Sequence, residues 1–210
     1  LNQDEDKPLM NRALRGTYPI GSTFKPFMAL AALEMKVRDL KRVINDNGHF
    51  QLGNHVFRDS TRGRGYGPVD MHRSIVVSSD VYYYSLAQDM GIDRIHDFMK
   101  PFGFGQITGI DLVGEARGIL PSREWKQRRF KQRWAQGDTI SIGIGQGYNA
   151  FTILQLAHAV ATLANDGIVM KPHLVKKIIN SKTGEEEIVA KDPVDVCLLY
   201  TSDAADDLIG

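Results

Sequence analysis

A turn followed by an unusually apolar helix is the feature that most constrains this chain. Residues 18–21 (Tyr-Pro-Ile-Gly) are typical of a turn, and residues 26–35 predict a helix that is apolar almost all round. Pro26 suits the first turn of that helix, because the backbone N–H groups there have no intrahelical partner. A helix of this composition has to be buried, so we expect it to be a central helix of the core.

A serine and a lysine lie three residues apart at the start of this helix. Because residues i and i+3 share a helix face, we expect the Lys25 amine to reach the Ser22 hydroxyl. The helix dipole and the free N–H groups favour a developing negative charge at this end. The pattern therefore predicts a nucleophile, Ser22, activated by a base, Lys25. A serine N-cap followed by an exposed lysine would give the same pattern.

A second short loop carries a hydroxyl and a carboxylate two residues apart. It joins two predicted helices, roughly residues 69–77 and 81–90. On such a loop Ser78 can relay a proton, and Asp80 can bind a substrate amide or Lys25. Ser79 or Asp80 would serve equally well as the N-cap of the second helix, so this pattern alone leaves both interpretations open.

The two motifs together resemble those of class B penicillin-binding proteins, most closely the elongation-type penicillin-binding protein 2 branch. Ser-x-x-Lys is a signature of penicillin-binding proteins and class A β-lactamases, and the aspartate at position 80, in place of asparagine, resembles the elongation-type branch. The resemblance runs from about residue 1 to residue 192. Besides the two motifs it includes residues 8–13, 16–21, 109–112, 121–126 and 141–148.

The resemblance implies an α/β fold of the penicillin-binding protein/serine β-lactamase-like transpeptidase type, an antiparallel sheet flanked by helices. It also implies a serine-type D,D-transpeptidase that cross-links peptidoglycan stem peptides through an acyl-serine intermediate and is a target of β-lactams. The roles would fall on the residues of the two motifs: Ser22 as nucleophile, Lys25 as base, Ser78 as proton relay and Asp80 as substrate-binding residue.

The same resemblance implies partners and a location. The substrate would be the D-Ala-D-Ala end of the stem peptide, and membrane proteins of the elongation machinery would bind the full-length protein. The family is anchored in the cytoplasmic membrane, with its catalytic domain on the outer, periplasmic side, and needs no cofactor. Two alternatives stay open: a β-lactam-hydrolysing or β-lactam-sensing member of the same fold, and a non-catalytic scaffold of the elongation machinery.

A Lys-Thr-Gly match at residues 182–184 is interpreted as a decoy for the family's third motif. Residues 180–185 are typical of the polar turn of a β-hairpin. The three glutamates at 185–187 would also repel the substrate carboxylate that the family binds at this motif. We expect the functional motif to lie beyond this segment, which would leave the fold incomplete at the C-terminus and the chain by itself inactive.

Residues 1–193 are expected to form a partial transpeptidase domain, and residues 194–210 a non-native tail. The family resemblance stops abruptly after Pro193, and the residues beyond it resemble translated sequencing-adapter read-through. The single cysteine, Cys197, falls in this tail, so the rest of the chain has no residue that could form a disulfide or a thiolate–metal bond.

Composition excludes few functions but gives no support for nucleic-acid binding or a metal. The formal net charge is +1, and the glycine-rich basic loop at 58–67 lacks the interleaved aromatics of a nucleic-acid site. Nearby metal-ligating types fit no zinc template in their spacing, so we predict no metal site, although metal binding near them stays open; they are His49, His55, Asp59 and His72.

Overall fold

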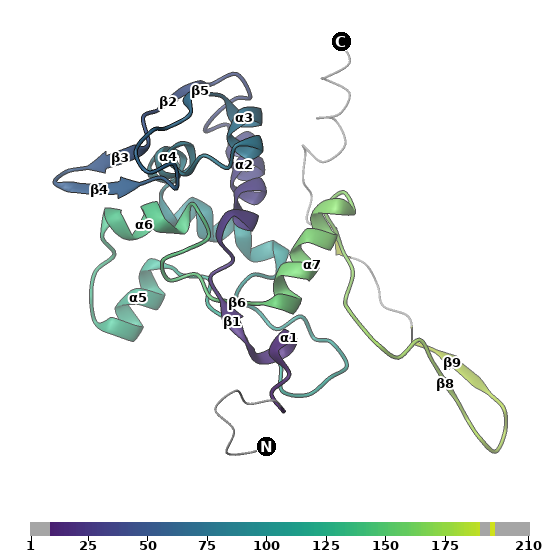
Figure 1. Cartoon of the computed structure of the whole chain (residues 1–210). Helices are drawn as coiled ribbons and strands as arrows, with labels where there is room; N and C mark the ends of the chain where they lie inside the picture. The colour runs from purple at the N-terminus through teal and green to yellow at the C-terminus, as the bar shows by residue number, and fades with distance from the viewer. Residues whose placement is uncertain (1–8, 190–193, 196–210) are drawn as a thin grey trace, which may run out of the picture. The chain divides into compact units, whose positions relative to one another are not determined.

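The computed structural model describes residues 9–189 and 194–195, which fall into two compact units (Figure 1). The first unit takes the described residues of the ranges Leu1–Tyr18, Pro101–Gly118 and Phe151–Gly210. The second unit comprises Pro19–Lys100 and Ile119–Ala150. Both predicted motifs, around residues 22 and 78, belong to the second unit.

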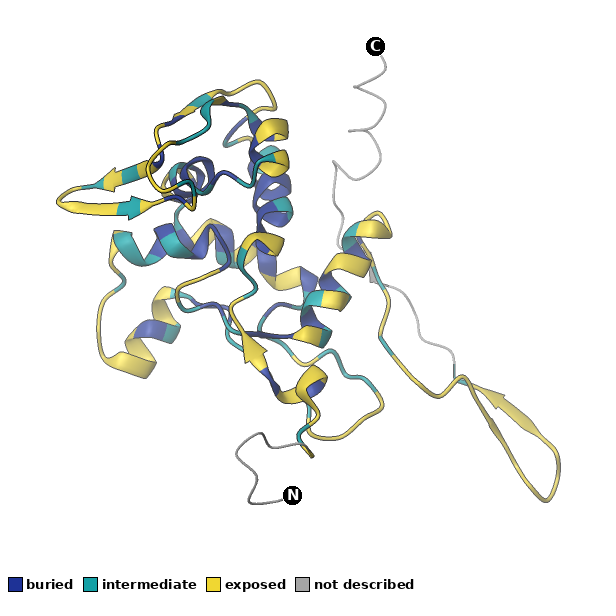
Figure 2. Ribbon diagram, in the orientation of Figure 1, coloured by how far each residue is buried: buried dark blue, intermediate teal, exposed yellow. Residues whose placement is uncertain are grey.

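Two helices form the centre of the second unit (Figures 1 and 2). Helix α2 (Lys25–Glu34) directly follows the 3-10 turn η1 (Gly21–Phe24), and most of its residues are buried, which confirms the predicted apolar core helix. Helix α4 (Asp80–Met99) packs against α2. Its backbone leaves the helical conformation at Gly91, with φ 73° and ψ 160°, a combination that only glycine adopts without strain. The predicted end of a helix at about residue 90 is therefore a kink, after which the chain resumes its helix.

Shorter elements complete this unit. Helix α6 packs against α4, and the antiparallel pairs β2–β5 and β3–β4 lie between α2 and α3 in the sequence. Their bounds are α3 (Met71–Val76), α5 (Arg123–Phe130), α6 (Gln136–Ile142), β2 (Ile44–Asp46), β3 (His49–Leu52), β4 (His55–Arg58) and β5 (Gly67–Val69).

The hairpin β3–β4 is attached to α4 by aromatic packing. The rings of Phe50 and Phe57 lie 6.3 and 5.6 Å from the ring of Tyr84, measured between centroids. The Tyr84 hydroxyl also donates to the carbonyl of Arg58 at 3.3 Å. Since Tyr84 is buried on α4, the hairpin is held against the helix that begins with the second motif.

The first unit is centred on helix α7 (Ile153–Ala164), which begins with a capping box between Thr152 and Gln155. The buried amide of Gln155 donates to the carbonyls of Arg117 and Gln106 and so closes the intervening loop. The other elements are α1 (Arg12–Arg15), β1 (Thr17–Tyr18), β6 (Phe151–Thr152), β7 (Ile168–Val169), β8 (Lys177–Ile179), β9 (Glu186–Ile188) and β10 (Val194–Asp195). The short 3-10 turn η2 (Lys100–Phe102) begins with the last residue of the second unit's first segment.

Strands in the described residues form two-stranded antiparallel pairs. In the first unit these are β1–β6, β7–β10 and β8–β9. Within the described residues, the expected antiparallel sheet flanked by helices therefore takes the form of separate two-stranded pairs beside helices. None of the helices in this described part of the chain combines the length and apolar character needed to cross a bilayer.

The Lys-Thr-Gly segment at 182–184 lies in the exposed turn between β8 and β9, as predicted. The Asn180 side chain accepts the Lys182 N–H at 2.9 Å, an arrangement typical of an asparagine turn, and Gly184 has a φ of 73°. Of the tail expected from residue 194, Val194 and Asp195 pair with β7, and Val196 to Gly210 lie outside the described residues.

Asp111 ties its loop to the segment that follows α7. Its two carboxylate oxygens accept the backbone N–H groups of Val175 and Leu174, each at 2.8 Å. These hydrogen bonds, that of Val175 first, favour the charged form and lower the pKa of Asp111 below its usual value.

Replacing this carboxylate by an amide should destabilise the chain in a pH-dependent way. A lowered pKa contributes stability that is present above the unfolded pKa and lost as the pH falls through the folded pKa. Asp111→Asn should therefore lower the melting temperature at pH 7, by a difference that shrinks once the pH falls below about 4. Thermal unfolding across this range measures it, with the exposed Glu187→Gln as control. A difference independent of pH would contradict the assigned hydrogen bonds.

Candidate active site

The loop that follows α6, at residues 143–148, holds the turn that presents Ser22. The backbone N–H of Gly21 donates to the carbonyl of Gly145 at 3.0 Å, and Ser22 itself is exposed on η1. A Cβ atom at Gly145 would collide with the Gly21 carbonyl, and its φ of 72° lies in the left-handed region. The residue at 145 therefore has to be glycine for the two segments to approach so closely.

Lys25 is buried, with only 2% of its side chain exposed, and its amine is fully hydrogen-bonded. It donates to the carbonyl of Ser78 at 2.6 Å, to the Ser78 hydroxyl at 2.9 Å and to Oδ1 of Asp80 at 2.7 Å. Three acceptors match the three donors of an ammonium group. The Nζ atom also lies 5.6 Å from the centre of the Tyr83 ring, and burial raises the pKa of Tyr83, which keeps that ring neutral.

Ser78 lies between Lys25 and Ser22. The Ser78 hydroxyl is 3.0 Å from the Ser22 hydroxyl, to which it donates. Among the hydrogen bonds of the described residues, the predicted direct one from Lys25 to Ser22 does not occur, which corrects that prediction. The reason is that the carbonyl and hydroxyl of Ser78 and the carboxylate of Asp80 take all three donors of the Lys25 ammonium, so none is left for Ser22. The four site residues predicted from the sequence nevertheless lie in one hydrogen-bonded chain.

The loop at 78–80 is strained, and its capping is settled. Ser78 has a φ of 54°, a left-handed conformation that is uncommon for a residue other than glycine and that clusters at functional sites. Ser79 is the N-cap of α4, since its hydroxyl accepts the Tyr82 N–H at 3.1 Å. Of the two candidate caps, Ser79 therefore serves, and the carboxylate of Asp80 remains available to Lys25.

The four residues considered as metal ligands do not form a cluster. Within the described part of the chain, no group of three or more His, Cys, Asp or Glu side chains could hold a metal ion. His55 packs edge-on against Phe57 at 4.6 Å, and His72 is exposed on α3. The buried Asp59 instead accepts the backbone N–H of Asp80 at 2.9 Å, a contact with the second motif that sequence analysis missed.

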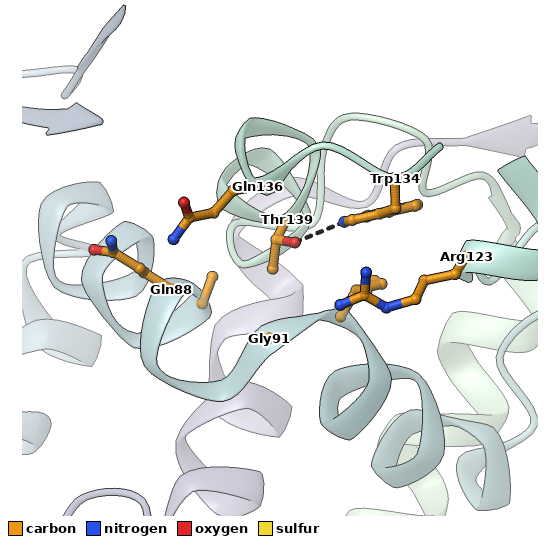
Figure 3. A pocket seen from close by; sticks show the side chains of 8 residues that line it. Gln88, Gly91, Arg123, Trp134, Gln136 and Thr139 are labelled. Carbon is orange, nitrogen blue, oxygen red and sulfur yellow. Dashed lines mark hydrogen bonds between the residues drawn. The ribbon is translucent and has the colours of Figure 1, made fainter. Parts of the chain in front are cut away.

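A separate pocket of about 390 Å³ opens in the second unit (Figure 3). Its walls come from α4, α6 and the segments around Arg123 and Trp134, and the indole of Trp134 donates to Thr139 at 2.8 Å. The residues that line it are Ala87, Gln88, Gly91, Ile92, Arg123, Trp134, Gln136 and Thr139. None of the four predicted site residues is among them, so this pocket is not the candidate active site.

Comparisons with known proteins identify the family. The family model described as the penicillin binding protein transpeptidase domain matches residues 1–196. The chain belongs to this family. The peptidoglycan D,D-transpeptidase MrdA of Acinetobacter baumannii is 45% identical over 184 residues, 87% of this chain and 27% of that protein. This confirms the family and branch that the two motifs predicted.

Solved structures show the same fold. The Pseudomonas aeruginosa PBP2, determined in complex with WCK 5153, matches with a TM-score of 0.86 and 44% identity over 97% of this chain and 46% of that one. The Helicobacter pylori PBP2, determined in complex with MreC, matches with a TM-score of 0.85 and 30% identity over 99% of this chain and 37% of that one. The predicted transpeptidase fold is confirmed, and the chain spans less than a third of the curated relative it matches.

The close approach of Gly145 to Gly21 predicts a stability difference between two glycine substitutions. Gly145→Ala combines backbone strain with a collision, whereas Gly53→Ala, at a φ of 57° with open space around it, adds strain alone. We expect Gly53→Ala to lower the free energy of unfolding by about 1 kcal/mol and Gly145→Ala by about 3 kcal/mol or more. Chemical denaturation measures both. Equal losses would mean that the contact between the two segments is not tight.

Proposed function

We propose that the protein to which this chain belongs is a peptidoglycan D,D-transpeptidase with Ser22 as its nucleophile. The observation that carries the proposal is the continuous hydrogen-bonded chain from Asp80 through Lys25 and Ser78 to Ser22. A buried amine linked to an exposed hydroxyl at a helix start is what activation of a serine requires.

The reaction would proceed by acyl transfer. The relay runs once Lys25 has given up one proton and become neutral. The Ser78 hydroxyl then turns to donate to the Lys25 amine and to accept from Ser22, so that the Ser22 proton passes to Ser78 while the Ser78 proton passes to Lys25. Ser22 Oγ then attacks the carbonyl of the penultimate D-alanine of a stem peptide. The peptide bond breaks, the departing D-alanine amine takes back one proton by the same route, and Ser22 is left acylated. An amine of a second stem peptide then attacks the ester carbonyl, its proton passes by the same route to Ser22 Oγ as the ester bond breaks, and the new peptide bond leaves Ser22 free.

Two further groups support this chemistry. The first turn of the helix that begins at η1 leaves backbone N–H groups without intrahelical partners, and the Ser22 N–H among them suits a developing oxyanion. Oδ1 of Asp80 binds Lys25, and Oδ2 has no hydrogen bond among the described residues, so it is available to a substrate amide. Asp80 is therefore proposed as the substrate-binding residue of this site.

Partners and location are inferred from the relatives. The complex of Helicobacter pylori PBP2 with MreC supports a partner from the elongation machinery, and the family's name supports β-lactams as ligands. We infer a protein of the cytoplasmic membrane whose catalytic domain faces the periplasm. A hydrolytic relative would need a carboxylate placed to activate water. Among the described residues hydrogen-bonded in series to Ser22, the one carboxylate is that of Asp80, which we assign to Lys25 and the substrate amide.

The test uses a hybrid, because the chain covers only part of its relatives. Residues 9–189 replace the aligned segment of the Pseudomonas aeruginosa PBP2. We expect a fluorescent penicillin to label the hybrid, Ser22→Ala to abolish labelling, and Lys25→Ala to slow it by about 10²- to 10⁴-fold. Thr23→Ala, the neighbouring exposed hydroxyl, should label normally.

Thermal unfolding of each hybrid verifies that the variants are folded. Labelling of a folded Ser22→Ala hybrid would remove Ser22 as the nucleophile. A folded but unlabelled parent hybrid would count against the proposed activity as a whole.

A further inference from the structure

Two buried carboxylates lie behind the second motif without a cationic partner among the described residues. Asp46 is 1% exposed and Asp59 is 5% exposed, and both belong to the segment 44–69 between α2 and α3. A buried charge is tolerated only where hydrogen bonds replace its hydration. The hydrogen-bond donors bound by these two carboxylates therefore indicate the structural role of each carboxylate.

Asp59 binds the start of α4. Its Oδ2 accepts the backbone N–H of Asp80 at 2.9 Å, and its Oδ1 accepts the N–H of Thr61 at 2.9 Å and the hydroxyl of Ser60 at 3.2 Å. The N–H of Asp80 is the first of the helix and has no intrahelical acceptor. Asp59 thus accepts a hydrogen bond from an N–H group for which the helix itself has no acceptor.

Asp46 binds the neighbouring residue. Its Oδ2 accepts the hydroxyl of Ser79 at 2.6 Å, and its Oδ1 accepts the N–H of Gly48 at 2.8 Å. The same Ser79 hydroxyl caps α4 through the N–H of Tyr82. The two carboxylates therefore bind successive residues of the motif, Ser79 and Asp80.

We propose that Asp59, assisted by Asp46, is a positioning residue for the second motif and acts through Asp80. Fixing residues 79 and 80 keeps Ser78 in its left-handed conformation, and so keeps the Ser78 hydroxyl and the Asp80 carboxylate on Lys25. The segment that carries both carboxylates is itself attached to α4 by the Tyr84 contacts. The proposal rests on the proposed function only for its effect on acylation.

The contact requires a carboxylate rather than an amide. Two backbone N–H groups donate to different oxygens of Asp59, that of Asp80 to Oδ2 and that of Thr61 to Oδ1. In Asp59→Asn the NH₂ group must face one of these donors in either orientation, so one hydrogen bond is lost although the shape is unchanged.

The first experiment measures hydrogen exchange in the 210-residue chain and does not depend on activity. In Asp59→Asn we expect the Asp80 amide to exchange at least about tenfold faster, while the Tyr82 amide, capped by Ser79, stays protected. Asp93→Asn, which removes a surface carboxylate paired with Arg123, is the control. An unchanged Asp80 amide, or an equal rise at all amides of α4, would overturn the proposal.

The second experiment tests the route through Asp80 in the hybrid. Asp59→Asn should reduce the acylation rate constant by about 10- to 100-fold without weakening initial penicillin binding. In a background that lacks both side chains positioned by this contact, Ser78→Ala with Asp80→Ala, the same substitution should cause no further loss, whereas a purely structural effect would multiply with the loss already present. Multiplying losses would therefore overturn the positioning role. Labelling of Ser22→Ala, by contrast, would overturn the proposed function and leave the exchange result standing.

Discussion

The second unit depends on keeping one ammonium group buried. Removing a lysine charge from water costs several kcal/mol, which is recovered only with good geometry and complete hydrogen bonding. Lys25 also lies in the first turn of α2, where the helix dipole disfavours a positive charge, while Asp80 lies in the first turn of α4, where the dipole favours a negative one. The ion pair joins the starts of the two central helices. Neither the apolar α2 nor the loop at 78–80 is therefore stable in its present position without the other.

Features decided by local chemistry could be predicted from the sequence. The apolar run after Pro26 predicted a buried helix, and the polar turn at 180–185 identified the Lys-Thr-Gly match as part of a hairpin. Both depend on side chains within a few residues of one another. The grouping of Ser22 with Ser78, 56 residues apart, came from the family resemblance and not from spacing.

Contacts made across the fold could not be predicted. The sequence placed Lys25 against Ser22 because they share a helix face, but the better acceptors come from Ser78 and Asp80, more than 50 residues away. The sequence singled out Asp59 only as a possible metal ligand near histidines. The residue type alone does not indicate which backbone N–H an aspartate side chain will accept in the folded protein. Asp46 gave no signal at all, because an aspartate at the end of a short strand is ordinary.

The arrangement around Ser78 explains why so many contacts converge on three residues. A left-handed non-glycine residue costs about 1–3 kcal/mol, and a hydrogen bond to a charged group contributes about 1.5–3 kcal/mol. One such bond would roughly offset the strain and leave the loop free to relax. Here charged groups bind Ser78, Ser79 and Asp80 in turn, through Lys25, Asp46 and Asp59. The excess makes the strained conformation the stable one, so the hydroxyl of Ser78 is oriented toward Ser22 before any substrate binds.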